Sequence, residues 1–243
     1  MPEETIAIIP ARGGSKRCPG KNVAKFKGKT LVAHTIEQAT KAGVFDRIIV
    51  STDDPQVISI ASQYTVEIER RDEALSSDNS PLIDVLRQHI DKFKFSSDAI
   101  ICLLLVTGPL RKMYDIIESF ELFKNSDRKN SVVSVTENEN PLEMSWKLKN
   151  GYLQPYFDNL KLKTTRKQDF AKSYRYNDAA IFDIASNFSN PDRKLFGDSP
   201  IPYIMPPERS INIDYEFQLK LVQLIGEYWD QVHSTIRQVN EGQ

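Results

Sequence analysis

Residues 8–22, with the sequence IIPARGGSKRCPGKN, combine the residue types that bind a polyphosphate. An apolar, strand-like run leads into a loop with three glycines, two arginines and two lysines. Glycines let backbone N–H groups come close to an anion, and cationic side chains neutralise its charge. A solvated basic loop is the alternative, but Pro10 and Pro19 stiffen a segment that a mere linker would leave flexible. The pattern therefore predicts an anion site.

Two common phosphate motifs do not fit this loop. The P-loop needs four residues between its first glycine and Gly-Lys-Ser/Thr, and the dinucleotide fingerprint needs G-x-G-x-x-G. Neither pattern can be placed on residues 8–22. The sequence therefore disfavours a nicotinamide-dependent dehydrogenase.

The composition indicates an ordinary globular protein. The chain has 243 residues, of which 40% are hydrophobic, and a formal net charge of −1, which suits a single domain over 1–243. A nucleic-acid partner is not expected, because such proteins carry a basic excess. Two cysteines make no disulfide framework, and no apolar run approaches the roughly 18 residues of a membrane span. Since the N-terminus also lacks a signal-peptide core, we expect a cytoplasmic protein without a membrane partner.

The elements that must position the loop alternate between strand and helix. This rhythm predicts an α/β fold with an open, doubly wound, mostly parallel sheet. Strands are expected at 5–9, 47–51, 66–69, 99–106 and 131–136, and parallel strands again at 179–184 and 202–204. Helices are expected at 29–42, 55–61, 78–93, 112–123 and 216–227. Ligands of such sheets lie beyond the carboxyl ends of the strands, which is where the loop begins.

The rhythm breaks at 138–172. This segment is polar, with short strand-like patches at 145–149 and near Tyr152. It predicts an insertion, or arm, that leaves the main sheet.

Residues 5–22 resemble the signature of the CMP-sialate synthetase family of cytidylyltransferases, I-x-I-I-P-A-R-G-G-S-K-x-x-P-x-K-N. Further similarities follow over nearly the whole chain, at 45–54, 70–71, 75–78, 109–111 and 211–214. The family includes acylneuraminate, legionaminate and pseudaminate cytidylyltransferases. The resemblance implies a Rossmann-like sheet of the nucleotide-diphospho-sugar transferase type. It also implies a reaction in which CTP and a nine-carbon α-keto acid sugar give the CMP-sugar and pyrophosphate.

On the nucleotide side, the resemblance implies that Lys21 neutralises phosphate charge and that Arg12 assists it in catalysis. The implied nucleotide-binding residues are Ala11, Arg12, Gly13, Gly14, Ser15, Lys16, Lys21, Asn22, Arg71, Asp78 and Ser80. For Arg71 the alternative is a surface ion pair with a neighbouring acid. For Asp78 the alternative is a plain helix N-cap.

The reaction implies Mg²⁺ as cofactor, with Asp214 as its catalytic carboxylate ligand. The family ends a strand with Asp-x-Asp, whereas this chain has Asn212 at the first position. An amide oxygen can coordinate Mg²⁺ but brings no charge. Metal binding is then weakened or rests on Asp214 alone, unless Asp214 only caps the last helix.

On the sugar side, the chain departs further from the family. Leu105 stands where the family has a glutamine that hydrogen-bonds the sugar, and a basic segment near 165–175 resembles the one that meets the acid sugar. The implied sugar-binding residues are Arg111, Arg166, Lys167, Gln168 and Arg175. A solvated arm is the alternative for this segment.

Two other functions remain open at this point. One is a cytidylyltransferase for another acid sugar, such as a 3-deoxy-octulosonate. The other is a nucleotide-binding homologue impaired in catalysis, for which Asn212 and Leu105 are the evidence. The resemblance further implies a homodimer in which the arm at 138–172 of each subunit reaches toward the other's site.

Overall fold

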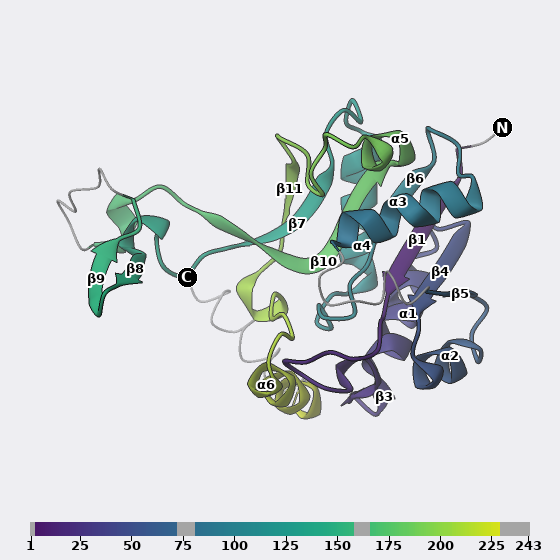
Figure 1. Cartoon of the computed structure of the whole chain (residues 1–243), viewed down its shortest axis with the longest axis horizontal. Coiled ribbons are helices and arrows are strands. Elements are labelled where there is room, and N and C mark those ends of the chain that lie inside the picture. The colour runs from purple at the N-terminus through teal and green to yellow at the C-terminus, as the bar shows by residue number, and fades with distance from the viewer. Residues whose placement is uncertain (1–2, 72–80, 158–165, 229–243) are drawn as a thin grey trace, which may run out of the picture.

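The computed structural model describes residues 3–71, 81–157 and 166–228. Its centre is a seven-stranded sheet with the order β11-β7-β10-β6-β1-β4-β5 (Figure 1). The strands are β1 (Thr5–Pro10), β4 (Arg47–Thr52), β5 (Glu67–Arg70), β6 (Ile100–Leu103), β7 (Val132–Glu137), β10 (Tyr174–Ile184) and β11 (Ile201–Ile204). Strand β1 pairs in parallel with β4 and β6, and β4 with β5.

One expected strand direction is wrong. Residues 179–184 belong to β10, which runs antiparallel to both β6 and β7, whereas β11 is parallel to β7 as expected. The chain leaves β7 for the arm and returns along β7 as β10. The described residues between these strands contain no α-helix, and such a direct return places two strands antiparallel. The sheet is therefore mixed on this side and parallel on the side that carries the loop.

Helices cover both faces of the sheet, which confirms the doubly wound α/β fold. Along β1, Ala7 and Ile9 pack with α1 (Leu31–Ala42), α2 (Pro55–Ala61) and α4 (Met113–Lys124). The alternate residues Ile6 and Ile8 pack with α3 (Leu82–Phe93) and α5 (Ala185–Ser189) on the other face. Both sets are fully buried because successive strand residues point to opposite faces.

Local capping sets the ends of several helices. Helix α1 begins at Leu31 and not at Lys29, because Thr30 is its N-cap and accepts a hydrogen bond from Ala33 N. The two preceding residues form β3 (Lys29–Thr30), which pairs with β2 (Lys25–Phe26). Asp54 caps α2, and both α2 and α6 (Glu216–Glu227) have the predicted bounds. The expected start of a helix at Asp78 lies outside the described residues.

The arm is a small hairpin held away from the sheet (Figure 1). Strands β8 (Trp146–Lys149) and β9 (Tyr152–Pro155) pair antiparallel, as the strand-like patches predicted. The hairpin exposes large apolar side chains, with Leu148 74%, Tyr152 76% and Leu153 66% accessible. Exposed apolar clusters of this kind mark contact surfaces.

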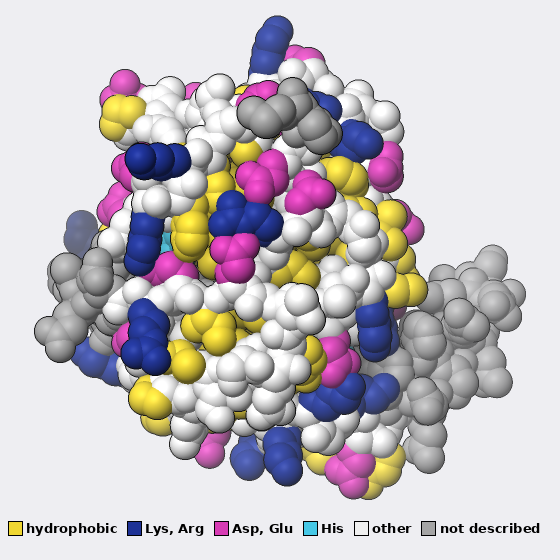
Figure 2. All heavy atoms as spheres, turned by 90° about the vertical axis from the view of Figure 1, so that its right-hand side faces the viewer, with side chains coloured by type: hydrophobic (Ala, Val, Ile, Leu, Met, Phe, Trp, Pro, Cys, Tyr) yellow, Lys and Arg dark blue, Asp and Glu magenta, His cyan; other side chains and the backbone are white. Residues whose placement is uncertain are grey.

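The face opposite the arm has a different character. Figure 2 shows Lys and Arg side chains interspersed with Asp and Glu over this face, so that neither sign forms a continuous stripe. Within the described residues, no helix is both long enough and apolar enough to cross a bilayer.

Candidate functional site

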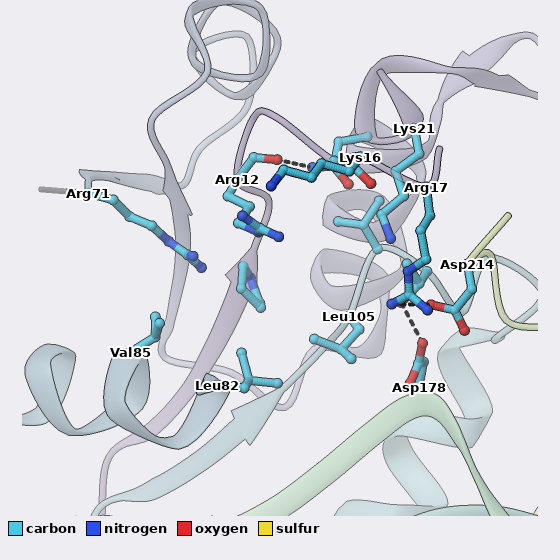
Figure 3. Close-up of a pocket in the computed structure, with 15 residues that line it drawn as sticks. Arg12, Lys16, Arg17, Lys21, Arg71, Leu82, Val85, Leu105, Asp178 and Asp214 are labelled. Carbon is cyan, nitrogen blue, oxygen red and sulfur yellow. Dashed lines mark hydrogen bonds and ion pairs between the residues drawn. The ribbon is translucent and has the colours of Figure 1, made fainter. Parts of the chain in front are cut away.

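A cavity of about 590 Å³ opens beyond the carboxyl ends of β1, β5 and β6 (Figure 3). This is the edge at which parallel α/β sheets bind their ligands. Seven of the predicted residues line it: Arg12, Ser15, Lys16, Lys21, Asn22, Arg71 and Asp214. The fold thus brings together residues that are up to about 200 positions apart in the chain.

The remaining predicted nucleotide residues divide into two groups. Ala11, Gly13 and Gly14 belong to the loop but do not line the cavity. Ala11 is buried and anchors the loop to β4, since its N–H donates to Ser51 O at 2.8 Å and its carbonyl accepts from Thr52 Oγ1 at 2.7 Å. Asp78 and Ser80 lie outside the described residues.

The two adjacent glycines of the loop have different roles. Gly14 has φ +69°, a left-handed conformation that favours glycine. Gly13 does not, and its N–H donates to Asp53 Oδ1 at 2.7 Å. The Gly13 amide is therefore engaged by Asp53 and is not offered to an anion, in contrast to the expectation for the loop glycines. Asp53 lies in the stretch 45–54 that resembles the family, but it was not predicted as a site residue.

Asn22 and Lys21 fix the far side of the loop. Asn22 is buried and donates from Nδ2 to the Arg12 carbonyl at 2.8 Å, so its side chain braces the loop. Lys21 donates from Nζ to Ile213 O at 3.2 Å, which ties the loop to the segment before α6. Burial lowers the pKa of Lys21, while Asp214 and Asp178 favour its charged form. A largely buried ammonium group therefore stands between the loop and two carboxylates.

Asp178 is a cavity residue that the sequence interpretation missed. Its Oδ2 accepts a 2.6 Å hydrogen bond from Thr107 Oγ1, and burial raises its pKa. The backbone at Asp178 is left-handed, with φ +61°, at a register shift in the pairing of β10 with β7. A Cβ on Gly108 would lie 2.9 Å from the Asp178 carbonyl, so only glycine fits there. Such strain persists where the surroundings fix it, often at functional sites.

Asp214 lines the same side of the cavity as Asp178 (Figure 3). Its carboxylate lies 3.6 Å from Nη2 of Arg17, which is one of the four cationic residues of the loop. Asn212 is not among the lining residues, and its Oδ1 is buried without a hydrogen-bond partner among the residues that the structure describes. In the described ranges, no group of three or more His, Cys, Asp or Glu side chains is arranged to hold a metal ion. Of the described residues that line the cavity, two carry carboxylates, Asp178 and Asp214.

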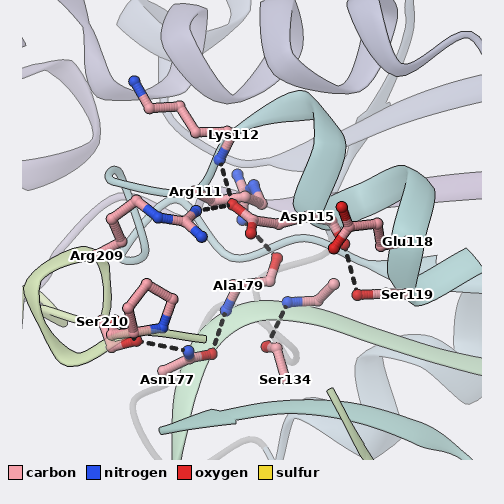
Figure 4. A network of polar contacts seen from close by, with 12 residues as sticks. Arg111, Lys112, Asp115, Glu118, Ser119, Ser134, Asn177, Ala179, Arg209 and Ser210 are labelled. Carbon is pink, nitrogen blue, oxygen red and sulfur yellow. Dashed lines mark hydrogen bonds and ion pairs between the residues drawn. The ribbon is translucent and has the colours of Figure 1, made fainter. Parts of the chain in front are cut away.

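Arg111 does not act as predicted. Its side chain is 1% exposed and does not line the cavity. It donates from Nη1 to the carbonyls of Ala179 at 2.7 Å and Leu105 at 3.2 Å, and burial lowers its pKa to about 10. Its guanidinium holds β10 against the segment after β6 and does not line the cavity. Figure 4 shows it beside Asp115, which pairs with Arg209.

The other predicted sugar residues are exposed and lie away from the cavity. Arg166, Lys167 and Gln168 lie in the arm, and Arg175 lies on the part of β10 that leads out of it. Arg175 donates to the Ser210 carbonyl at 3.1 Å. None of the four lines the cavity. Leu105 does line the cavity, so the leucine that replaces the family's glutamine faces the site.

Comparison with known sequences identifies similar proteins. The sequence pattern of the cytidylyltransferase family matches residues 6–228. The chain is 30% identical to the pseudaminic acid cytidylyltransferase of Campylobacter jejuni (strain 81-176), covering 91% of this chain and 96% of the relative. It is 31% identical to the N-acylneuraminate cytidylyltransferase of Escherichia coli O18:K1:H7, covering 93% of this chain and 53% of that protein.

Comparison with solved structures finds the same fold. The CMP:2-keto-3-deoxy-manno-octonic acid synthetase complexed with CTP superposes with a TM-score of 0.67 and 15% identity, covering 92% of this chain and 98% of that one. A 4-diphosphocytidyl-2C-methyl-D-erythritol synthase superposes with a TM-score of 0.65 and 11% identity, covering 93% and 99%. At these identities the likeness establishes the architecture alone.

Proposed function

The chain belongs to the cytidylyltransferase family, and we propose that it transfers CMP from CTP to a nine-carbon α-keto acid sugar and releases pyrophosphate. The observation that carries this proposal is the convergence of Arg12, Lys16 and Lys21 on one cavity that faces Asp214. The relatives that cover most of the chain are named for pseudaminic and N-acylneuraminic acids. They support a sugar of that class.

The cavity provides the two requirements of this displacement. The anomeric hydroxyl of the sugar attacks the α-phosphorus in line, so the protein must chiefly hold the reactants and neutralise negative charge. Arg12, Lys16 and Lys21 suit the triphosphate. At the other end, Arg71 with Leu82 and Val85 offers a cation beside an apolar wall, which suits a planar base.

We propose Mg²⁺ as the cofactor, held by the carboxylates of Asp214 and Asp178. Mg²⁺ in such sites keeps several waters and takes one or two carboxylates together with substrate phosphates. Two carboxylates in one cavity fit this requirement without a third acidic ligand. When bound, the ion would neutralise phosphate charge. A contribution from Asn212, whose amide lies outside the cavity lining, stays a prediction.

We also propose a homodimer in which the arm of one subunit completes the sugar side of the other. The exposed apolar hairpin and the absence of Arg166, Lys167, Gln168 and Arg175 from their own subunit's cavity support this arrangement. The cytoplasmic location expected from the sequence suits an enzyme that draws on free CTP and stays a prediction.

The proposal is tested by a substrate panel. Pyrophosphate release is measured with each of the four nucleoside triphosphates against pseudaminic, legionaminic, N-acetylneuraminic and 3-deoxy-octulosonic acids, with Mg²⁺ present. We expect turnover with CTP and a nine-carbon sugar only. Turnover with 3-deoxy-octulosonic acid alone, the eight-carbon sugar, would favour a cytidylyltransferase for that sugar. CTP binding without any turnover would favour a nucleotide-binding homologue that is impaired in catalysis.

A further inference from the structure

A chain of buried polar groups runs from Glu69 to Arg71 behind the cavity. Arg71 Nε donates to Ser51 Oγ at 2.8 Å, and Ser51 Oγ donates to Glu69 Oε2 at 3.1 Å. Ser51 is fully buried on β4, and Glu69 is only 4% exposed on the adjacent strand β5. Because β4 and β5 are paired in register at Ser51 and Glu69, the sheet itself fixes this geometry.

Arg71 has a donor that finds no partner among the described residues. The residue is 9% exposed and lines the cavity, and its Nη2 is buried with no hydrogen-bond partner in that part of the chain. A buried donor left unpaired costs about 1–3 kcal/mol, so its retention indicates a ligand acceptor. Figure 3 shows the guanidinium pointing into the cavity at the end opposite Asp214.

Glu69 is an unusual residue to find inside the sheet. A buried carboxylate is costly unless it is paired and hydrogen-bonded. Here it contacts Lys92 Nζ at 3.0 Å and His89 Nε2 at 3.3 Å, in addition to Ser51. Burial lowers the pKa of His89, so the imidazole is neutral near pH 7, and Lys92 supplies the compensating charge. The carboxylate is therefore held in place from α3 while it orients the Ser51 hydroxyl.

We propose that Glu69 is a positioning residue that acts through Ser51 to hold the Arg71 guanidinium in the orientation that receives the nucleotide. The hydroxyl proton of Ser51 is directed to Glu69, so its lone pairs face Arg71 Nε. With Nε fixed, the planar guanidinium can rotate little, and Nη2 is aimed at the ligand. This inference rests on the proposed function, since the ligand it serves is the nucleotide.

A double-mutant cycle tests this coupling, with CTP affinity measured by calorimetry on the full chain. Ser51→Ala removes the link, and Arg71→Met removes the group that is positioned. We expect the dissociation constant for CTP to rise about tenfold in S51A and about a hundredfold in R71M. In the R71M background, S51A should add less than about twofold, because the effects of coupled residues do not multiply.

The control is Glu67→Gln, on the same strand but exposed and ion-paired with Arg47; it should leave CTP affinity unchanged. If S51A is unstable, E69Q replaces it in the same cycle, with folding checked by thermal unfolding. The inference would be overturned, and the proposed function left standing, if S51A bound CTP as tightly as wild type. The same holds if the fold-changes of S51A and R71M in the CTP dissociation constant multiplied in the double variant. A wild-type protein that binds no CTP would refute the proposed function together with it.

Discussion

The cavity and the arm differ in the kind of side chain they present and in how those side chains are held. The cavity is lined by charged side chains whose positions are fixed by buried contacts within one subunit, such as Lys21 with the Ile213 carbonyl and Asp178 with Thr107. The arm, in contrast, exposes apolar side chains on β8 and β9 and holds its polar candidates outside the cavity. The described nucleotide candidates thus lie largely within one subunit's cavity, whereas four of the five sugar candidates are exposed outside it.

This difference separates two kinds of variant. Changes in the cavity should weaken CTP binding or turnover, whether the protein is a monomer or a dimer. Changes in the arm should affect the sugar and the assembly while CTP binding survives. The predictions below test this separation, beginning with the largest expected effect.

Lys21→Met should reduce CMP-sugar formation by about a thousandfold. Methionine retains much of the side-chain volume but removes the buried charge, and loss of one preorganised electrostatic group typically costs two to three orders of magnitude. Steady-state pyrophosphate release measures the effect. Lys25→Met, at an exposed position on β2, is the matched control and should behave as wild type. A K21M protein with a tenth of wild-type activity or more would contradict the role of Lys21.

Leu148→Glu with Leu153→Glu should reduce activity by about a hundredfold by breaking the dimer. Both side chains are exposed in the single subunit, and charges on an apolar contact surface oppose its burial. Light scattering should show a monomer, while CTP affinity stays within about twofold of wild type. Lys149→Gln on the same hairpin is the control. A wild-type protein that is itself monomeric would refute the arm proposal.

Mixing two inactive variants sharpens the test of cross-subunit contribution. R166A should impair the arm's contribution to the sugar, whereas K21M impairs the cavity. If the arm serves the partner's site, random reassociation restores about a quarter of the sites, because half of the dimers carry one intact cavity and one intact arm. An equal mixture that stays inactive would show that Arg166 serves its own subunit's cavity, and an R166A protein with wild-type activity would show that it serves neither.

How far the sequence predicts the site depends on how local each part is. The loop from Arg12 to Asn22 is contiguous, so its residue types reveal its chemistry, and it lines the cavity as expected. Asp178 was missed because its place depends on a register shift and on the close approach of Gly108. Arg111 was expected to bind the sugar because the Pro-Leu-Arg stretch at 109–111 resembles the family, but its guanidinium is buried against two carbonyls.

The fold shows the same limit. The order and type of elements follow from periodicity, and nearly all of them are found within a few residues of their predicted bounds. The direction of β10 does not follow, because an apolar run buried on both faces reads the same in a parallel and an antiparallel strand. The arm between β7 and β10 decides the direction.

Asp178→Asn should lower activity about tenfold yet raise stability. Since burial raises the pKa of this carboxyl, the native state holds its proton more tightly than the unfolded state does. The ionised Asp178 therefore destabilises the folded protein. This loss of stability begins as the pH rises past the ordinary pKa of Asp and reaches its full size above the raised pKa. At pH 7 the variant should melt about 2–4 °C higher, and the gain should vanish below about pH 4.

The control for this change is Asp127→Asn, an exposed carboxylate outside the cavity, which should alter neither property. Calorimetric titration with Mg²⁺ in the presence of CTP separates the proposed metal role from a packing role. D178N should bind the metal more weakly. Unchanged Mg²⁺ affinity would remove Asp178 from the metal site, and a lower melting temperature would show that its charge stabilises the fold.

Asn212→Asp should have the smallest effect on activity, within about threefold of wild type. The variant restores the family's Asp-x-Asp pattern, but the side chain at 212 does not line the cavity, and its buried oxygen has no hydrogen-bond donor within the described part of the chain. A carboxylate there is desolvated without compensation, so the melting temperature should fall by a few degrees. If Asp178 already supplies the second carboxylate, the Mg²⁺ concentration for half-maximal activity should hardly move. A gain of tenfold or more in activity, with a lower Mg²⁺ requirement, would instead identify the natural chain as an impaired enzyme and return the metal site to residues 212 and 214.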